Sequence, residues 1–276
     1  YENFNPASIR AEYQGDVTRY GEGTDWHDLL TRTAPIQSYS LSLLSSRERS
    51  STAVIAGYQE QQGVVINTGT KLFSLRMNHE LSLSNNKLKV GFNLAPSYRM
   101  DHNNRLRSDG IEGYYAKILE SSPILSPYND DGSYRIGAFS PGMTSYVTPI
   151  ARIKESQDDY KTTRILGNAY ANYTLLPGLT LKMNLGVDKG AETRNQYLPQ
   201  VAVNTSLNLP TRSTAISSSV DNYSYTGEAF VNYQKTIKED HHLEALVGYA
   251  VQKFKEESNS INATGFPTDD VRYISA

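Results

Sequence analysis

The chain has 276 residues, with 27 basic and 29 acidic side chains and a formal net charge of -2. This balance provides no basic field for nucleic acid, so no nucleic-acid partner is expected. The absence of cysteine excludes disulfide scaffolds, thiol nucleophiles and cysteine-ligated zinc. Since no apolar run reaches the roughly 18 residues of a transmembrane helix, a helical membrane protein is also excluded.

Residues 1–34 are polar and show no sustained pattern, whereas short segments further along alternate apolar and polar side chains. In 180–188, for example, Leu181, Met183 and Leu185 alternate with polar residues. Such alternation is typical of a strand with one apolar and one polar face. Eight strands of this kind are predicted, at 36–44, 52–61, 72–83, 88–98, 161–174, 179–189, 222–236 and 243–254.

Short and long connections alternate between these strands. Tight turns at 45–51, 84–87, 176–178 and 238–241 alternate with longer segments at 63–70, 101–160, 191–221 and 256–276. In an antiparallel meander every second connection emerges at the same end, so the short turns share one rim and the long loops the other. Bacterial outer-membrane barrels show this asymmetry, with the long loops outside. We therefore predict an all-β antiparallel meander that forms part of a transmembrane β-barrel wall of about eight strands, with loops 101–160, 191–221 and 256–276 extracellular.

No motif indicates catalysis or a bound cofactor. No nucleophile elbow frames the serines, so the protein is not expected to be an enzyme. Asp130-Asp131-Gly132 is interpreted as a turn rather than a calcium loop, because the spaced ligands of such a loop are missing. His241-His242 lies at a predicted hairpin tip, where adjacent side chains diverge, and is interpreted as solvated rather than metal-binding.

A set of short segments follows in order along nearly the whole chain. They are TDWHD at 24–28, RTAP at 32–35, YSLS at 39–42, GY at 57–58, QGV at 62–64, SLRMN at 74–78, LKVGFN at 88–93, SPYNDDGSY at 126–134 and FPTDDVRY at 266–273. As an ordered set they resemble the SusC/RagA family of TonB-dependent outer-membrane transporters.

The resemblance implies a larger plugged barrel of about 22 strands in the outer membrane of a Gram-negative bacterium. Residues 1–34 would then be a lead-in from the plug region, and residues 35–276 a partial β-barrel in contact with outer-membrane lipid. The implied function is TonB-energised import of oligosaccharides or peptides. The implied partners are a SusD-like lipoprotein lid and TonB itself, which would bind through an N-terminal part missing from this sequence.

On this fold, the polar faces of the strands line the barrel lumen. Their side chains are candidates for contact with a polar solute, although we expect most of them to form hydrated wall or to face the plug. The lumen-facing candidates are Arg76, Asn78, Glu80, Asn93, Asn168, Lys182, Asn184, Glu228 and Asn232.

Two alternatives remain open at the level of sequence. A small, complete outer-membrane β-barrel with a structural or interaction role would pair its first strand with its eighth. A soluble glycan-binding β-sandwich would instead bury the face that carries Leu181 and Leu185 against a second sheet.

Overall fold

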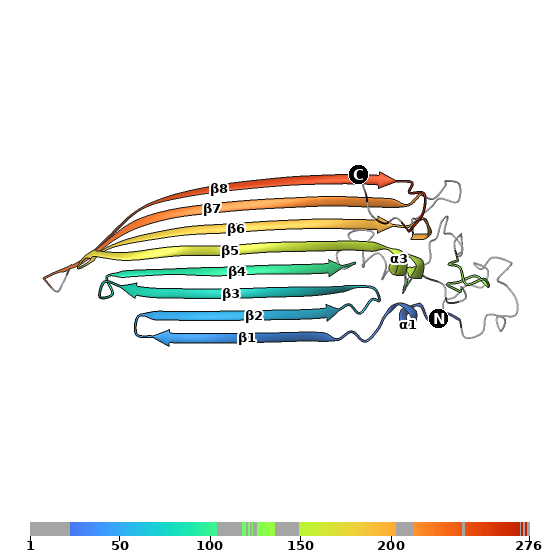
Figure 1. Ribbon diagram of the computed structural model, residues 1–276, viewed down its shortest axis with the longest axis horizontal. Coiled ribbons are helices and arrows are strands. Elements are labelled where there is room, and N and C mark those ends of the chain that lie inside the picture. The colour runs from blue at the N-terminus through green and yellow to red at the C-terminus, as the bar shows by residue number, and fades with distance from the viewer. Residues whose placement is uncertain are drawn as a thin grey trace.

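The computed structural model describes residues 23–103, 118–119, 121, 123, 126–135, 149–202, 212–238, 241–270, 272 and 274. Eight strands form one antiparallel sheet in chain order (Figure 1), which confirms the predicted meander. The strands are β1 (Ile36–Arg47), β2 (Ser50–Gln62), β3 (Gly69–Leu83), β4 (Leu88–His102), β5 (Gln157–Leu176), β6 (Leu179–Leu198), β7 (Thr214–Ile237) and β8 (His241–Thr264). The helices of these residues are short: α1 (Trp26–Leu30), α3 (Pro149–Glu155) and η4 (Gln200–Ala202). No helix in the described ranges is long and apolar enough to cross a membrane.

The strands are longer than predicted, mainly at the end that carries the long loops. β6 continues to Leu198, β7 begins at Thr214 and β8 continues to Thr264, so the loops predicted at 191–221 and 256–276 were too long. The loop predicted at 101–160 is shortened at both ends, because β4 reaches His102 and β5 begins at Gln157. Residues 1–22, 104–117, 136–148 and 203–211 of the predicted lead-in and loops lie outside the described residues.

The short turns use residues that suit tight reversal of the chain. The β5–β6 turn is Pro177-Gly178, in which proline fixes its own φ and Gly178 adopts a φ of 81°. A Cβ atom at Gly178 would lie 2.1 Å from the carbonyl oxygen of Gln234, and the Gly178 carbonyl accepts a hydrogen bond of 2.8 Å from the Gln234 amide. The turn therefore packs directly against β7, where a side chain would not fit.

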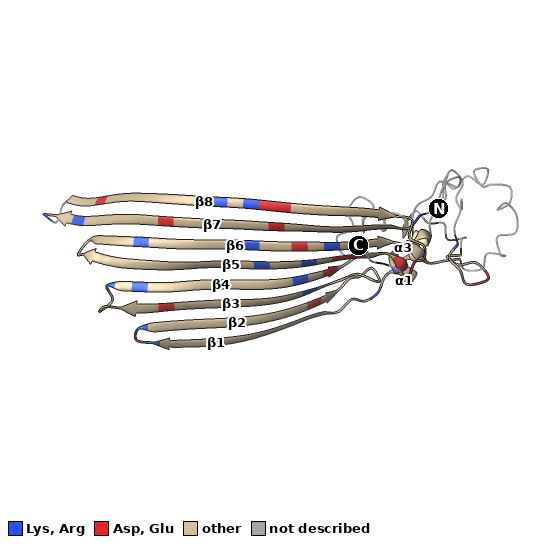
Figure 2. Cartoon of the chain, turned by 45° about the horizontal axis from the view of Figure 1, so that its top comes forward, with Lys and Arg blue, Asp and Glu red and all other residues tan. Residues whose placement is uncertain are grey.

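The sheet has one apolar face and one polar face. On the apolar face, residues 73–83 of β3, 88–98 of β4, 179–187 of β6, 223–233 of β7 and 243–251 of β8 present no Asp, Glu, Lys or Arg. Each stretch is about ten residues long, the length with which a tilted strand crosses a bilayer. Many of these side chains are exposed, including Leu185 at 67% and Val247 at 74%. In Figure 2, most charged positions of β5 and β6 lie toward the end of the sheet that carries α1 and α3.

The loop-side boundary of the apolar stretch is slanted relative to the hydrogen-bonded rows. In β2 and β3, the first charges beyond it are Glu60 and Lys71, which are register partners. The same row of partners reaches β8 at Asn259. In β8, however, the first charge on this face is Lys253, six residues nearer the turn than Asn259. Six steps separate β2 from β8, so the average shift between these strands is about one residue, or about 3.3 Å, per strand spacing of about 4.8 Å, which corresponds to a slant of about 35°. The shift falls within β6–β8, because Lys161 of β5 is still in the row of Lys71.

The short turns show the same slant. The row of partners that starts at Arg47, the last residue of β1, reaches β8 at Tyr249. β8 begins at His241, eight residues before Tyr249, and seven steps separate β1 from β8. The turn ends therefore step by about one residue per strand, and the first charges on the apolar face shift by a similar average from β2 to β8, as expected for strands tilted by about 35° from a common normal.

A small hydrophobic core lies beyond the strands at the loop end. It contains Trp26, Leu30, Val65, Ile118, Ile150 and Ile153, with Tyr128 and Tyr134 packed against it. The two tyrosine rings stack at 5.6 Å, and the Tyr134 hydroxyl donates a hydrogen bond of 2.8 Å to the Glu155 carboxylate. Burial, and then the Glu155 carboxylate, raise the pKa of Tyr134. This core orders residues 23–34 and the hairpin at 126–135 at the same end of the sheet.

Both alternatives to a wall segment of a larger barrel are contradicted by the described residues. β1 pairs with β2 and β8 pairs with β7, and neither forms a second pairing, so these eight strands do not close into a small barrel. Figures 1 and 2 show a single sheet layer, and Leu185 is exposed rather than packed against a second sheet. The sandwich and the closed eight-stranded barrel are therefore wrong for this part of the chain.

Candidate polar binding face

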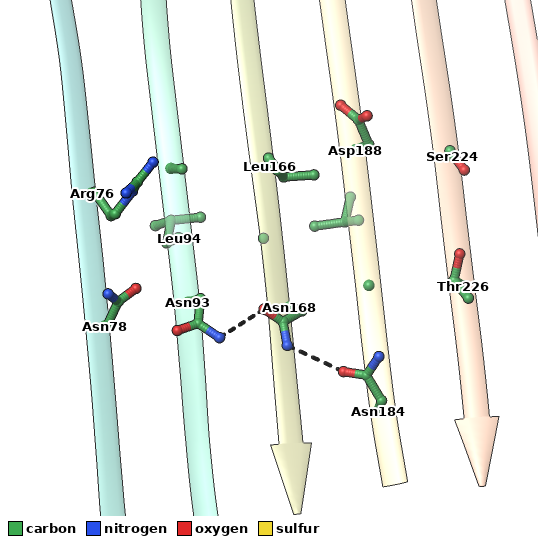
Figure 3. A pocket seen from close by; sticks show the side chains of 14 residues that line it. Arg76, Asn78, Asn93, Leu94, Leu166, Asn168, Asn184, Asp188, Ser224 and Thr226 are labelled. Atoms are coloured by element: carbon green, nitrogen blue, oxygen red, sulfur yellow. Dashed lines mark hydrogen bonds between the residues drawn. The ribbon is translucent and has the colours of Figure 1, made fainter.

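Four of the predicted lumen-facing residues form a ladder of hydrogen bonds across β4 to β7. The Asn93 amide donates to the Asn168 side-chain oxygen at 2.9 Å. Asn168 in turn donates to Asn184 at 3.2 Å (Figure 3), and Asn184 donates to the Glu228 carboxylate at 3.1 Å. The ladder follows from register: Asn93 pairs with Asn168 and Asn184 with Glu228 directly, while the middle bond is diagonal.

The three asparagines of the ladder, but not Glu228, line a groove of about 460 Å³ on the polar face. Arg76 and Asn78 of β3 line the same groove, together with Asn93, Asn168 and Asn184. No carboxylate of the described residues lies within salt-bridge distance of Arg76. The groove thus offers a guanidinium group, amide donors and amide acceptors, a combination suited to hydrogen bonding with a polar solute.

The other predicted residues lie nearer the short turns and do not line this groove. Glu80 accepts a hydrogen bond of 2.7 Å from the Tyr170 hydroxyl and lies 3.0 Å from Lys89 Nζ. The Tyr170 ring covers Gly91, where an added Cβ atom would lie 2.6 Å from the ring. Glu80 therefore holds neighbouring strands together. Lys182 and Asn232 are on the same face, closer to the turn end.

Sequence reasoning missed two arginine–aspartate pairs on the polar face. Arg164 binds Asp188 with two hydrogen bonds of 3.0 and 2.6 Å at the edge of the groove. Arg194 binds Asp158 with two of 2.7 and 2.9 Å near the loop end, where the Asp158 side chain is fully buried. Arg164 and Asp188 lie within the predicted strands, whereas Asp158 and Arg194 lie in polar stretches beyond them that carry no alternation. The pairing itself depends on the β5–β6 register.

No family model matches this sequence. Relatives in sequence include three proteins of Formosa agariphila, each described as a TonB-dependent receptor. P26 is 28% identical over 257 residues, P3 is 25% identical over 276 residues, and P39 is 24% identical over 250 residues. The alignments cover 93%, 97% and 90% of this chain, but only 25%, 26% and 22% of the relatives. The chain thus spans about a quarter of the length of the curated relatives it matches.

Solved structures show the same fold. A structure of the RagAB peptide importer in the closed-closed state superposes with a TM-score of 0.72 at 20% identity, over 92% of this chain and 28% of that chain. A structure of the RagAB peptide transporter gives a TM-score of 0.72 at 21% identity, over 95% and 30% of the two chains. The relatives are described as receptors, importers and transporters rather than enzymes. These findings bear out the predicted resemblance: the chain is similar in sequence to TonB-dependent receptors and in fold to the RagAB structures.

Proposed function

We propose that this chain forms part of the wall of an outer-membrane importer in a Gram-negative bacterium, without catalytic activity of its own. The observation that carries the proposal is the slanted apolar stretch. Each uncharged stretch is about ten residues long, the turn ends step by about one residue per strand, and the first charges on the apolar face shift by the same average from β2 to β8. A slant of about 35° agrees with the tilt of about 35–45° of strands in outer-membrane barrels. The apolar face would then contact lipid, and the polar face would line the lumen.

Closure of the barrel requires strands beyond those described. An edge strand leaves N–H and C=O groups unpaired, and each such group in hydrocarbon costs several kcal/mol. We propose that β1 and β8 pair with neighbouring strands of a larger barrel, as the coverage of about a quarter of the relatives' length supports. TonB would supply the energy through a part of the protein other than this wall, and a SusD-like lipoprotein would cover the loop end.

The solute would be an oligosaccharide or a peptide, and the groove offers chemistry for either. The amide ladder supplies donors and acceptors that match sugar hydroxyls or peptide groups. Arg76, which has no carboxylate partner among the described residues, would in addition attract a carboxylate of the solute. The lumen-facing candidates that line the groove are therefore proposed to contact the solute or the plug.

Orientation tests this proposal most directly. An epitope tag next to Asp131, in the hairpin at 126–135, should bind antibody on intact cells that lack the lid lipoprotein. A control tag in the short turn at 84–87 should bind antibody only after the outer membrane is permeabilised. The reverse pattern would overturn the topology, and labelling of both tags on intact cells would contradict a membrane-crossing sheet.

A further inference from the structure

Three lysines gather on the apolar face of β6 and β8, immediately beyond the uncharged stretch. Lys189 and Lys255 flank Tyr223 of β7 in register, and Lys253 is the register partner of Tyr225. The Lys189 ammonium group lies 5.1 Å from the centroid of the Tyr223 ring, within cation–π range. Figure 2 shows Lys or Arg positions on β6 and β8, with Asp or Glu positions beyond them toward the loop end of β8.

The nearest carboxylates on the same face of β7 and β8 lie one alternate position beyond the row of Lys189, Tyr223 and Lys255, and Asp221 is the first charge beyond the uncharged stretch of β7. Asp221 and Glu257 are register partners one alternate position beyond Lys255. Glu257 pairs with Lys255, but both side chains are more than half exposed, at 57% and 58%, so this ion pair contributes little. The order along β8 is therefore Val251, Lys253, Lys255 and then Glu257. Elsewhere at this boundary, Lys71 is 3.2 Å from Glu60, and Lys161 of β5 has Asp159 on the same face one alternate position away, so the cluster of three lysines is confined to β6 and β8.

We infer that Lys189, Lys253 and Lys255 bind phosphorylated headgroups of the lipid leaflet at the loop end of the sheet. The inference rests on the proposed function, which places the apolar stretch in the membrane. In that setting the side chains just beyond hydrocarbon meet headgroups, so lipid is the occupant. Lysine stems lie along the apolar surface while the ammonium groups reach phosphate oxygens. Tyr223 provides an amphipathic ring at the same depth.

The test uses the full-length transporter, purified in micelles that contain equal amounts of phosphatidylglycerol and phosphatidylcholine. Native mass spectrometry then measures the ratio of the two retained lipids. The wild type should prefer phosphatidylglycerol, and the K189Q/K253Q variant should lose that preference by about tenfold or more. A matched control, K89Q/K182Q, removes two lysines from the polar face of the same sheet and should keep it. K189R/K253R, which retains both charges, should also keep it.

An unchanged ratio in K189Q/K253Q, or an equal loss in K89Q/K182Q, would overturn the inference. Its failure is distinguishable from failure of the proposed function. If Leu185→Arg lowers the stability of the protein in lipid vesicles while K189Q/K253Q retains the wild-type lipid ratio, the lysine site alone is wrong. If Leu185→Arg costs no stability there, the membrane assignment fails and the lysine site fails with it.

Discussion

Three consecutive residues of β6 provide a sharp test of the two faces of the sheet. Met183 and Leu185 are on the apolar face, and Asn184 between them is on the polar face. Arginine introduced at each position in turn adds the same side chain to the same short piece of strand. Only the face and the depth within the apolar stretch differ between the three variants.

The expected magnitudes follow from position. The uncharged stretch of β6 runs from Leu179 to Val187, so Met183 is at its centre and Leu185 is two residues from its end. At about 3.3 Å per residue and a tilt of about 35°, Leu185 lies about 5 Å closer to the loop-side boundary. Arginine on the lipid face costs about 2–4 kcal/mol at the midplane and about 0–1 kcal/mol near the interface. We expect about 3 kcal/mol for Met183→Arg and about 2 kcal/mol for Leu185→Arg.

Asn184→Arg should cost about 1 kcal/mol or less. It removes two hydrogen bonds of the amide ladder, each with a net value of about 1 kcal/mol, but arginine can pair again with Glu228. The assay is reversible denaturant unfolding of the full-length protein in lipid vesicles. The loss of unfolding free energy should be large for Met183→Arg, small for Asn184→Arg and intermediate for Leu185→Arg. A flat profile, or the largest loss at Asn184, would refute the assignment of the faces.

The two arginine–aspartate pairs should differ in value, because Asp158 is fully buried whereas the Arg164 and Asp188 side chains are 58% and 35% exposed. Arg194→Ala should lower the free energy of local opening at the start of β5 by about 3 kcal/mol. Arg164→Ala should lower the free energy of local opening around Arg164 by less than about 1 kcal/mol. Amide hydrogen exchange measures both values, and equal effects would contradict the difference in burial. Hydrogen bonds from the Ser133 hydroxyl and amide lower the pKa of Asp131. The ionised carboxylate therefore stabilises the hairpin at 126–135 fully at pH values above the ordinary pKa of aspartate, and this stabilisation is lost only as the pH falls through the lowered pKa. Amide protection in the hairpin should thus persist to pH values below about 4 and be independent of pH in Asp131→Asn, whereas loss near neutral pH would exclude this role.

The sequence predicted the middle of the strands well and their loop ends poorly, for a physical reason. Where one face contacts an apolar environment and the other contacts water, side chains must alternate, and residues 180–188 show this clearly. Beyond the apolar stretch both faces are polar. Ser217, Ser218 and Ser219 of β7 and Lys255, Glu256 and Glu257 of β8 therefore carry no alternation, although the backbone remains paired. Strand length outside the apolar stretch is fixed by backbone hydrogen bonds rather than by side-chain pattern.

The polar face shows the same division. The alternation within each strand predicted that Asn93, Asn168 and Asn184 lie on the polar face, because the face of a residue depends only on whether its position in the strand is odd or even. It did not reveal that these amides are joined, since the diagonal bond from Asn168 to Asn184 depends on the register across the β5–β6 turn. Parity can be predicted from a single strand, whereas register requires the lengths of two strands and the geometry of the turn between them.

The strictly sequential order of the sheet has a consequence for assembly. Every strand pairs only with its neighbours in the chain. Each new pairing during folding therefore requires closure of either a short turn or one longer connecting segment. The paired length grows along the chain, from 12 register pairs between β1 and β2 to 24 between β7 and β8. Folding can therefore proceed by addition of one hairpin at a time to a growing edge. The long β7–β8 hairpin would be the most persistent template, and the β1–β2 hairpin the first to fray.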